Sequence, residues 1–279
     1  MKTLMVQGTS SGAGKTTLVA ALCRIFSDSG WCVAPFKSQN MSNFSYMNAE
    51  FEISRAQAIQ ALAARCKITP DLNPILLKPL GNYYSTVYLL GKKYRKMHAS
   101  NYYSKFVKKQ GIKTVTESLQ RLKKKYDLII LEGAGSPAEI NLEKFDIANM
   151  KIAEKNNTPV ILISDIDRGG SFASIVGTLV LLDPKYQKLI KGFVINKFRG
   201  NINILKPGFH KLKQKTKRPV FGAIPMSKIE LPEEDSLGVT PKEMIWHKKN
   251  LNKVDKQLNK LSKLVKKNLN IKAIERLID

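Results

Sequence analysis

The chain has 279 residues, 43% of them hydrophobic, which is enough for one large buried core with a modest appendage. Cys23, Cys32 and Cys66 are too few and too scattered for a disulfide framework, and they form no Cys-x-x-Cys pair for zinc or redox chemistry. No apolar run approaches the ~20 residues that span a bilayer, and the first predicted strand begins almost at Met1. We therefore expect a soluble, cytoplasmic protein with no membrane partner.

The formal net charge of +25 raises the question of an anionic partner such as nucleic acid. The basic residues are mostly lysines, spread over residues 92–125 and 242–272 without a nucleic-acid-binding motif. Surfaces that read bases favour the bidentate guanidinium of arginine, so lysine-rich solvated faces explain the charge better. We expect no nucleic-acid partner.

Short apolar runs alternate with segments of helical period along the chain. This alternation predicts an α/β fold with a mainly parallel sheet and helices on both faces. Ligands of such sheets bind beyond the carboxyl ends of the strands, so chemistry is expected just after each run. The predicted strands are 3–7, 32–36, 127–131, 159–164, 192–196 and 219–224, and the predicted helices are 15–27, 53–65, 172–182 and 205–215.

Two segments depart from the alternation. Residues 83–125 contain one predicted strand at 86–90 and two basic helical stretches, which we interpret as an insertion or cap near the site. The last stretch spaces its apolar residues as one helix face, which predicts a docked tail or an interdomain connector. We therefore divide the chain into a domain at 1–240 and a helical tail at 241–279. The apolar face consists of Leu251, Val254, Leu258, Leu261 and Val265.

A glycine-rich loop follows the first strand and opens a helix, which is the context of a phosphate-binding P-loop. Lys15 is predicted to reach the β- and γ-phosphates of ATP, and Thr16 to ligate Mg²⁺. The loop is a variant, because five residues rather than four separate Gly8 from Gly14. The residues predicted to bind nucleotide here are Gly8, Thr9, Ser10, Gly12, Ala13, Gly14, Lys15, Thr16 and Thr17.

Other polar residues follow the remaining strands. Lys37 comes directly after the second strand, where it could neutralise a migrating phosphoryl group. Glu132 ends a buried run in the position of a Walker-B acid and is our first metal ligand, with Glu52 as a weaker second candidate. Asn196 and Lys197 end one strand and Pro225 ends the last, and we assign these three to the purine end of the nucleotide, with structural capping as the alternative for Asn196.

At this point the motifs resemble those of the cobyric acid synthase family over nearly the whole chain. The spaced P-loop and Lys37 are more distantly similar to dethiobiotin synthetase, so we expect a P-loop fold of that type. The matching runs are Pro35-Phe36-Lys37, Gln39-Asn40-Met41, Arg55-Ala56-Gln57-Ala58, Asn73-Pro74-Ile75-Leu76-Leu77-Lys78-Pro79, Glu132-Gly133-Ala134-Gly135-Ser136-Pro137-Ala138-Glu139-Ile140-Asn141-Leu142, Asp165-Ile166-Asp167-Arg168-Gly169-Gly170, Asn196-Lys197-Phe198-Arg199-Gly200 and Glu234-Asp235-Ser236.

The resemblance implies an ATP- and Mg²⁺-dependent ligase that amidates peripheral carboxylates of a corrinoid, adenosylcobyrinic acid a,c-diamide. In the family mechanism ATP phosphorylates each carboxylate, and ammonia derived from glutamine then displaces phosphate. Asp167 and Arg168 are our candidates for the substrate side, because Arg168 could clamp a carboxylate. A capped helix end with a surface arginine is the alternative for that turn.

Two departures from the family are visible. The acidic residue that the family carries near Ser11 and Gly12 is missing, and these 279 residues do not include the family's glutamine-hydrolysing domain, so we expect ammonia from a separate or missing glutaminase. Alternatives are a dethiobiotin synthetase-like ligase, a cobyrinic acid a,c-diamide synthase, or a partition-type ATPase that binds DNA or membrane. A homodimer is left open.

Overall fold

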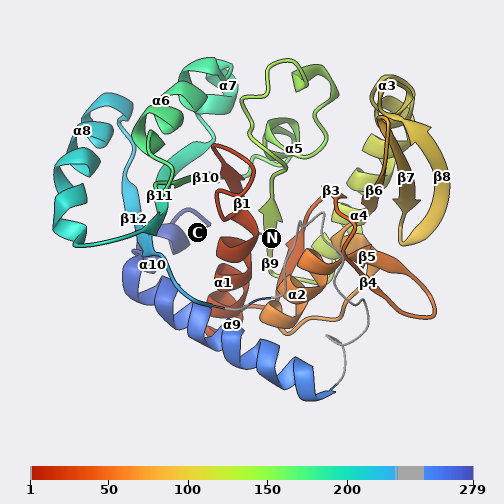
Figure 1. The fold of residues 1–279 in the computed structure, drawn as a ribbon, viewed down its shortest axis with the longest axis horizontal. Coiled ribbons are helices and arrows are strands. Elements are labelled where there is room, and N and C mark those ends of the chain that lie inside the picture. Colours follow the sequence, from red (N-terminus) through yellow and green to blue (C-terminus); the bar gives the residue numbers. More distant parts are fainter. Residues whose placement is uncertain (1, 230, 232–247, 279) are drawn as a thin grey trace.

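The computed structural model describes residues 2–229, 231 and 248–278, and a six-stranded sheet runs through the middle of this part (Figure 1). Neighbouring strands are parallel throughout, in the order β12-β11-β10-β1-β9-β2. The predicted α/β fold with a mainly parallel sheet is confirmed. The strands are β1 (Lys2–Gly8), β2 (Val33–Phe36), β9 (Leu128–Glu132), β10 (Val160–Asp165), β11 (Ile190–Phe198) and β12 (Val220–Pro225).

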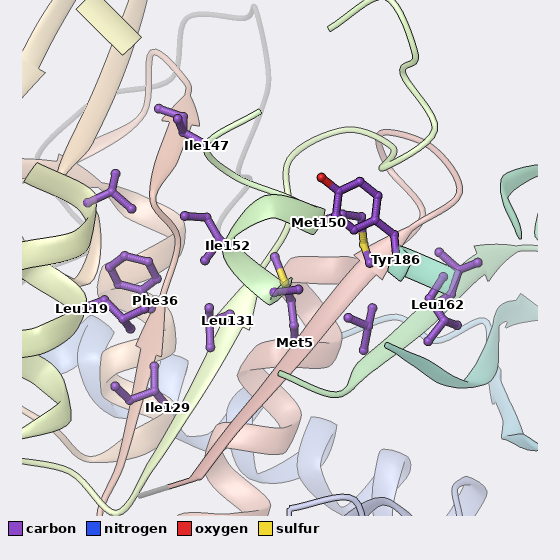
Figure 2. Close-up of a cluster of buried hydrophobic side chains, with 14 of the residues drawn as sticks. Met5, Phe36, Leu119, Ile129, Leu131, Ile147, Met150, Ile152, Leu162 and Tyr186 are labelled. Carbon is purple, nitrogen blue, oxygen red and sulfur yellow. The ribbon is translucent and has the colours of Figure 1, made fainter. Parts of the chain in front are cut away.

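Helices cover both faces of the sheet, because its central strands are apolar on both sides. On one face Leu4 and Val6 of β1 belong to a core that includes α1, α2, α9 and α10. Met5, between them, points to the other face, where Figure 2 shows it near Leu131 and Met150. The helices of the first face are α1 (Lys15–Asp28), α2 (Arg55–Ala64), α9 (Lys248–Asn268) and α10 (Ile271–Glu275). Those of the second are α4 (Ile112–Lys123), α5 (Met150–Lys155), α6 (Ser171–Leu181), α7 (Pro184–Gln187) and α8 (Lys206–Thr216).

A second sheet beside the first was not fully predicted. Its order is β3-β6-β7-β8, and its last two strands form a hairpin in the segment where the sequence predicted one strand and two basic helical stretches. β8 escaped prediction because its sequence, Lys-Lys-Tyr-Arg-Lys-Met-His, is largely charged and exposed. The strands are β3 (Gln39–Met41), β6 (Ile75–Gly81), β7 (Tyr84–Leu89) and β8 (Lys92–His98), and a separate antiparallel pair consists of β4 (Ser45–Met47) and β5 (Glu52–Ser54).

Helical structure follows β8 without interruption as far as Lys123. It runs through α3 (Ala99–Asn101), a π-helical segment (Tyr102–Gly111) and α4. Among the described residues, three short 3₁₀ helices connect other elements, at Pro70–Leu72, Glu143–Phe145 and Ile202–Leu205. Helical structure is therefore present in residues 83–125, as the sequence predicted, and it occupies the second half of that segment.

The C-terminal helix α9 lies across α1 and β12 (Figure 1). Four of the five apolar residues predicted to share one face, Val254, Leu258, Leu261 and Val265, are buried against the domain. The proposed boundary between residues 240 and 241, and the motif at 234–236, lie outside the described residues. Within the described residues no helix is long and apolar enough to cross a membrane.

Candidate functional site

The loop between β1 and α1 closes around the side chain of Lys15. Lys15 Nζ donates hydrogen bonds to the carbonyl oxygens of Ser10 at 2.9 Å and Gly135 at 2.7 Å. Gly14, directly before α1, has a φ of 99°, which a residue with a side chain would adopt only under strain. The positive end of the α1 dipole faces this loop, as required for binding an anionic group.

Other loop residues support this arrangement from behind. The Thr9 hydroxyl donates to the Ser164 hydroxyl at 3.0 Å and so joins the loop to β10. A Cβ atom added to Gly8 would lie 2.9 Å from Lys15 Nζ, so this glycine makes room for the lysine. Ser11, Gly12, Gly14, Lys15, Thr16 and Thr17 line a cavity in front of the loop, whereas Ala13 is fully buried.

Glu132, at the end of β9, is buried, and hydrogen-bond donors surround its carboxylate. Oε1 accepts from Thr16 Oγ1 at 2.7 Å and from Lys37 Nζ at 2.6 Å, and Oε2 accepts from Gln60 Nε2 at 2.6 Å. Gln57 Nε2 approaches the same Oε2 at 3.4 Å. Burying a carboxylate without partners costs on the order of several kcal/mol of folding free energy. The ion pair with Lys37 and the amide donors offset this cost for Glu132, which is only 1% exposed.

Thr16 and Glu132 fit a magnesium ion. Their side-chain oxygens are 2.7 Å apart on the wall of the cavity and are the hard oxygen donors that Mg²⁺ takes. The described residues contain no group of three His, Cys, Asp or Glu side chains that could hold a metal. Mg²⁺ usually takes one or two protein ligands and completes its coordination with substrate phosphates and water, so two protein ligands are compatible with a magnesium site.

The residues predicted for the purine end also reach the cavity. Asn196, Lys197 and Pro225 all line it, at the ends of β11 and β12. Asn196 Nδ2 donates to the Ala13 carbonyl at 2.9 Å, so this amide holds the P-loop, as in the capping alternative. Lys197 Nζ forms an ion pair with Asp165 and donates a hydrogen bond of 2.7 Å to its Oδ2.

Two cavities meet at the loop after β9. The first has a volume of about 400 Å³ and is lined by residues of the P-loop, by Lys37 and by Glu132. The second, of about 300 Å³, lies under the 136–150 segment and is walled by aromatic and aliphatic side chains that include Tyr103, Leu142 and Phe145. The residues common to both are Gln39, Met41, Ala134 and Gly135. A group in the second cavity can therefore approach a phosphate in the first.

Glu52 is not brought into either cavity. Its carboxylate accepts from Ser45 Oγ and pairs with Lys78 Nζ, between β5 and β6. Burial alone would raise the pKa of Glu52, but the hydrogen bonds from Lys78 and Ser45 hold that pKa below its usual value. The arrangement is that of an ion pair within the fold, apart from Thr16 and Glu132.

Asp167 and Arg168 are likewise outside the two cavities. Asp167 Oδ1 accepts from Arg199 Nε at 2.8 Å, and both Asp167 and Arg168 are exposed on the turn before α6. Gly170, at the end of this turn, caps α6 with a φ of 70°. The geometry is that of the capped-helix alternative, with the turn at the same edge of the sheet as the P-loop.

Sequence reasoning missed the polar residues of α2 that hold Glu132. Gln57 and Gln60 are fully buried, three residues apart on one face of a helix that is otherwise rich in alanine. Two buried amides on an apolar helix face are a signal, because each must find a partner inside the protein. Asn149 was missed as well: it exchanges two hydrogen bonds of 2.9 Å with the backbone of Ala134 and fixes the loop between the cavities.

Known proteins that are similar to this chain indicate its family. The family model described as the CobQ/CobB/MinD/ParA nucleotide binding domain (CbiA) matches residues 4–238. A probable cobyric acid synthase from Thermococcus kodakarensis is 54% identical over 243 residues, which are 86% of this chain and 50% of that protein. One from Methanococcus vannielii is 48% identical over 265 residues, 94% of this chain and 53% of that protein.

These relatives bear out the resemblance that the motifs indicated. The chain spans about half the length of the curated relatives it matches. Among solved structures, the MinD cell division protein of Aquifex aeolicus is similar with a TM-score of 0.45 and 12% identity, covering 81% of this chain and 83% of that one.

Proposed function

Because the chain belongs to the CobQ/CobB/MinD/ParA nucleotide-binding domain family, and its relatives at about half identity are named cobyric acid synthases, we propose that it is an ATP-dependent amide ligase of cobalamin biosynthesis. The proposed reaction converts peripheral carboxylates of adenosylcobyrinic acid a,c-diamide into carboxamides. The observation that carries the proposal is the set of Lys15, Thr16, Lys37 and Glu132 in the first cavity, which shares part of its wall with the second.

In this proposal the first cavity holds ATP. The ammonium of Lys15, which now donates to two backbone carbonyls, would donate to the β- and γ-phosphates, together with the N–H groups at the start of α1. Thr16 and Glu132 would hold Mg²⁺, which supplies neutralisation of phosphate charge when it is bound. Thr16 and Glu132 are already adjacent, whereas Lys15 would exchange its two carbonyl partners for the phosphates when ATP binds.

The second cavity would receive the acceptor carboxylate. At about 300 Å³ it is far smaller than a corrinoid macrocycle, so only a peripheral side chain of the substrate would enter it. The macrocycle would lie outside, against exposed apolar side chains near the opening. Those side chains are Met41 and Leu142, with exposed fractions of 50% and 39%.

The chemistry then needs positioning more than acid–base catalysis. A carboxylate oxygen attacks the γ-phosphorus, the bond from that phosphorus to the β-phosphate oxygen breaks, and ADP leaves. Ammonia next attacks the acyl carbon, inorganic phosphate leaves and the nitrogen loses a proton, which gives the amide. Lys37 lines the first cavity two residues before Gln39, which lines both, so it is suited to neutralising the phosphoryl group during transfer.

We also propose that ammonia comes from outside this domain. Glutamine hydrolysis needs a reactive thiolate paired with a base. Burial raises the pKa of Cys23 well above its usual value and that of Cys66 to about 12, so neither thiol is suited to nucleophilic attack. Cys32 lies at the opposite edge of the sheet from Lys37, where its Sγ approaches the Lys125 carbonyl at 3.8 Å.

An isotope experiment tests the acyl phosphate. Substrate whose carboxylates carry oxygen-18 is incubated with the protein, ATP, Mg²⁺ and ammonium, and the released phosphate is analysed by mass spectrometry. The proposal predicts one labelled oxygen in the phosphate for every amide formed, because the carboxylate oxygen stays with phosphorus. Amide formation without label in phosphate would contradict it.

A further inference from the structure

The cavity in front of the P-loop extends from the carboxyl ends of β12 and β11 to those of β9 and β2, and its two ends differ chemically. One end is polar and cationic and contains Lys15, Thr16, Lys37 and Glu132. The other end is apolar, and the residues that line it come from α1, from the end of β12 and the residue after it, and from α9. They are Leu18, Ile224, Pro225, Met226, Leu261 and Val265.

Leu261 and Val265 belong to α9, which begins at residue 248, beyond the match to the family model at residues 4–238. These two side chains are 1% and 0% exposed, so they form the floor of the apolar end rather than its rim. The distribution along the cavity corresponds to the two parts of a nucleotide, with anionic phosphates at one end and a flat, largely apolar base at the other.

Arg24 sets the position of α9 relative to α1. The guanidinium is fully buried with 1% of the residue exposed, and it donates to the backbone carbonyls of Leu62 at 3.0 Å and Ala63 at 2.9 Å, at the end of α2. Its other two bonds reach α9, at Asp255 Oδ1 with 2.6 Å and Asn259 Oδ1 with 2.7 Å.

This network joins three helices through one side chain. A buried guanidinium is tolerated only when its donors are satisfied, so the partners on α9 are held in one place along α1. Asp255 and Asn259 are four residues apart and thus on one side of α9. Leu261 and Val265 follow within two turns, so the network determines where they sit beneath the cavity.

We propose that α9 completes the subsite for the base of the nucleotide, and that Arg24 is the positioning residue that holds α9 there. The inference rests on the proposed nucleotide site but on no part of the amidation chemistry. It gives α9 a function inside this domain, in addition to any role as a connector.

The test compares two ligands that share phosphates but differ in the base. Affinities for Mg²⁺–ATP and for Mg²⁺–tripolyphosphate are measured by calorimetry on the full chain. Leu261→Ala is expected to weaken ATP binding about five- to tenfold by removing apolar contact, with tripolyphosphate affinity unchanged. Leu258→Ala is the matched control, because Leu258 is equally buried on α9 but is not part of the cavity wall.

Two further variants keep the test decisive if Leu261→Ala folds poorly. Val265→Thr keeps the shape of the side chain, places a hydroxyl in the apolar floor, and should also weaken ATP selectively. Replacing both Asp255 and Asn259 by Ala removes the partners of Arg24 on α9 and should also weaken ATP binding selectively. Lys256→Ala, on the exposed face of α9, should leave ATP affinity unchanged. Equal losses for ATP and tripolyphosphate, or unchanged ATP affinity in Leu261→Ala and Val265→Thr, would overturn the proposal.

Discussion

Lys37 and Glu132 form an ion pair of 2.6 Å across the carboxyl ends of two adjacent parallel strands. β2 and β9 are paired so that Phe36 is opposite Leu131, and the next residue of each strand is the charged one. The same oxygen of Glu132 also accepts from Thr16. One carboxylate therefore connects the residue expected to hold Mg²⁺ with the lysine expected to act on the transferring phosphoryl group.

Replacing Lys15 by Ala should lower nucleotide turnover by about 10²- to 10³-fold, because it removes a cation from the phosphates in a site sheltered from water. The fold should survive, since the side chain bonds to two loop carbonyls rather than to core residues. Turnover is measured as ADP release and folding by circular dichroism. Wild-type turnover in this variant would refute the P-loop assignment.

Replacing Lys37 by Ala should reduce kcat by about 10²-fold while changing ATP affinity little, because its charge is expected to matter during transfer. Steady-state kinetics at several ATP concentrations separate the two effects. Lys191→Ala, on the exposed start of β11, serves as a control for loss of one positive charge. A rise in KM with kcat unchanged would instead assign Lys37 to ground-state binding.

The magnesium requirement should respond to Glu132. Glu132→Gln exchanges an anionic oxygen for a neutral amide, so we expect about tenfold more Mg²⁺ to be needed for half-maximal turnover. The amide also loses the ion pair with buried Lys37, so a lower melting temperature is expected in the same variant. If the Mg²⁺ titration matched that of the unmodified protein, Glu132 would be a structural acid only.

The central sheet was predictable because its strands are continuous apolar runs, such as residues 128–131, that can only lie between two layers. The P-loop, Lys37 and Glu132 were predictable for a related reason, since each follows such a run and parallel strands bring their carboxyl ends to one edge. The local sequence pattern was therefore sufficient to predict both the central sheet and the positions of these residues at its carboxyl edge.

The second sheet and the surroundings of Glu132 were not predictable in this way. β8 is stabilised by pairing with β7, which a single charged segment does not reveal. Gln57, Gln60 and Arg24 act through partners that are distant in sequence, at Glu132, Asp255 and Asn259. Two amides on an apolar helix face indicate that buried partners exist, but which residues those partners are depends on how the helices pack.

Glu52 gives a prediction about stability rather than catalysis. Its folded pKa lies below the usual value, so the carboxylate stabilises the protein above the unfolded pKa of about 4.3, and this contribution is lost as pH falls through the folded pKa. Glu52→Gln should therefore cost about 1 kcal/mol of unfolding free energy near neutral pH, with the difference shrinking in acid.

Urea unfolding at a series of pH values measures this difference. Glu117→Gln is the control, because its pair with Lys113 is exposed and 4.0 Å long. A Glu52→Gln penalty that stays constant as the pH falls, or a Mg²⁺ requirement that changes with Glu52, would contradict the assignment of this residue to an ion pair within the fold.

The most direct measurement incubates the purified chain with ATP, Mg²⁺, adenosylcobyrinic acid a,c-diamide and nitrogen-15-labelled ammonium, and then analyses the corrinoid by mass spectrometry. We predict labelled carboxamides in the product, formed only when ATP is present, and no product when glutamine replaces ammonium. A corrinoid recovered unchanged, together with ATP hydrolysis that responds to DNA instead, would contradict the proposed ligase activity.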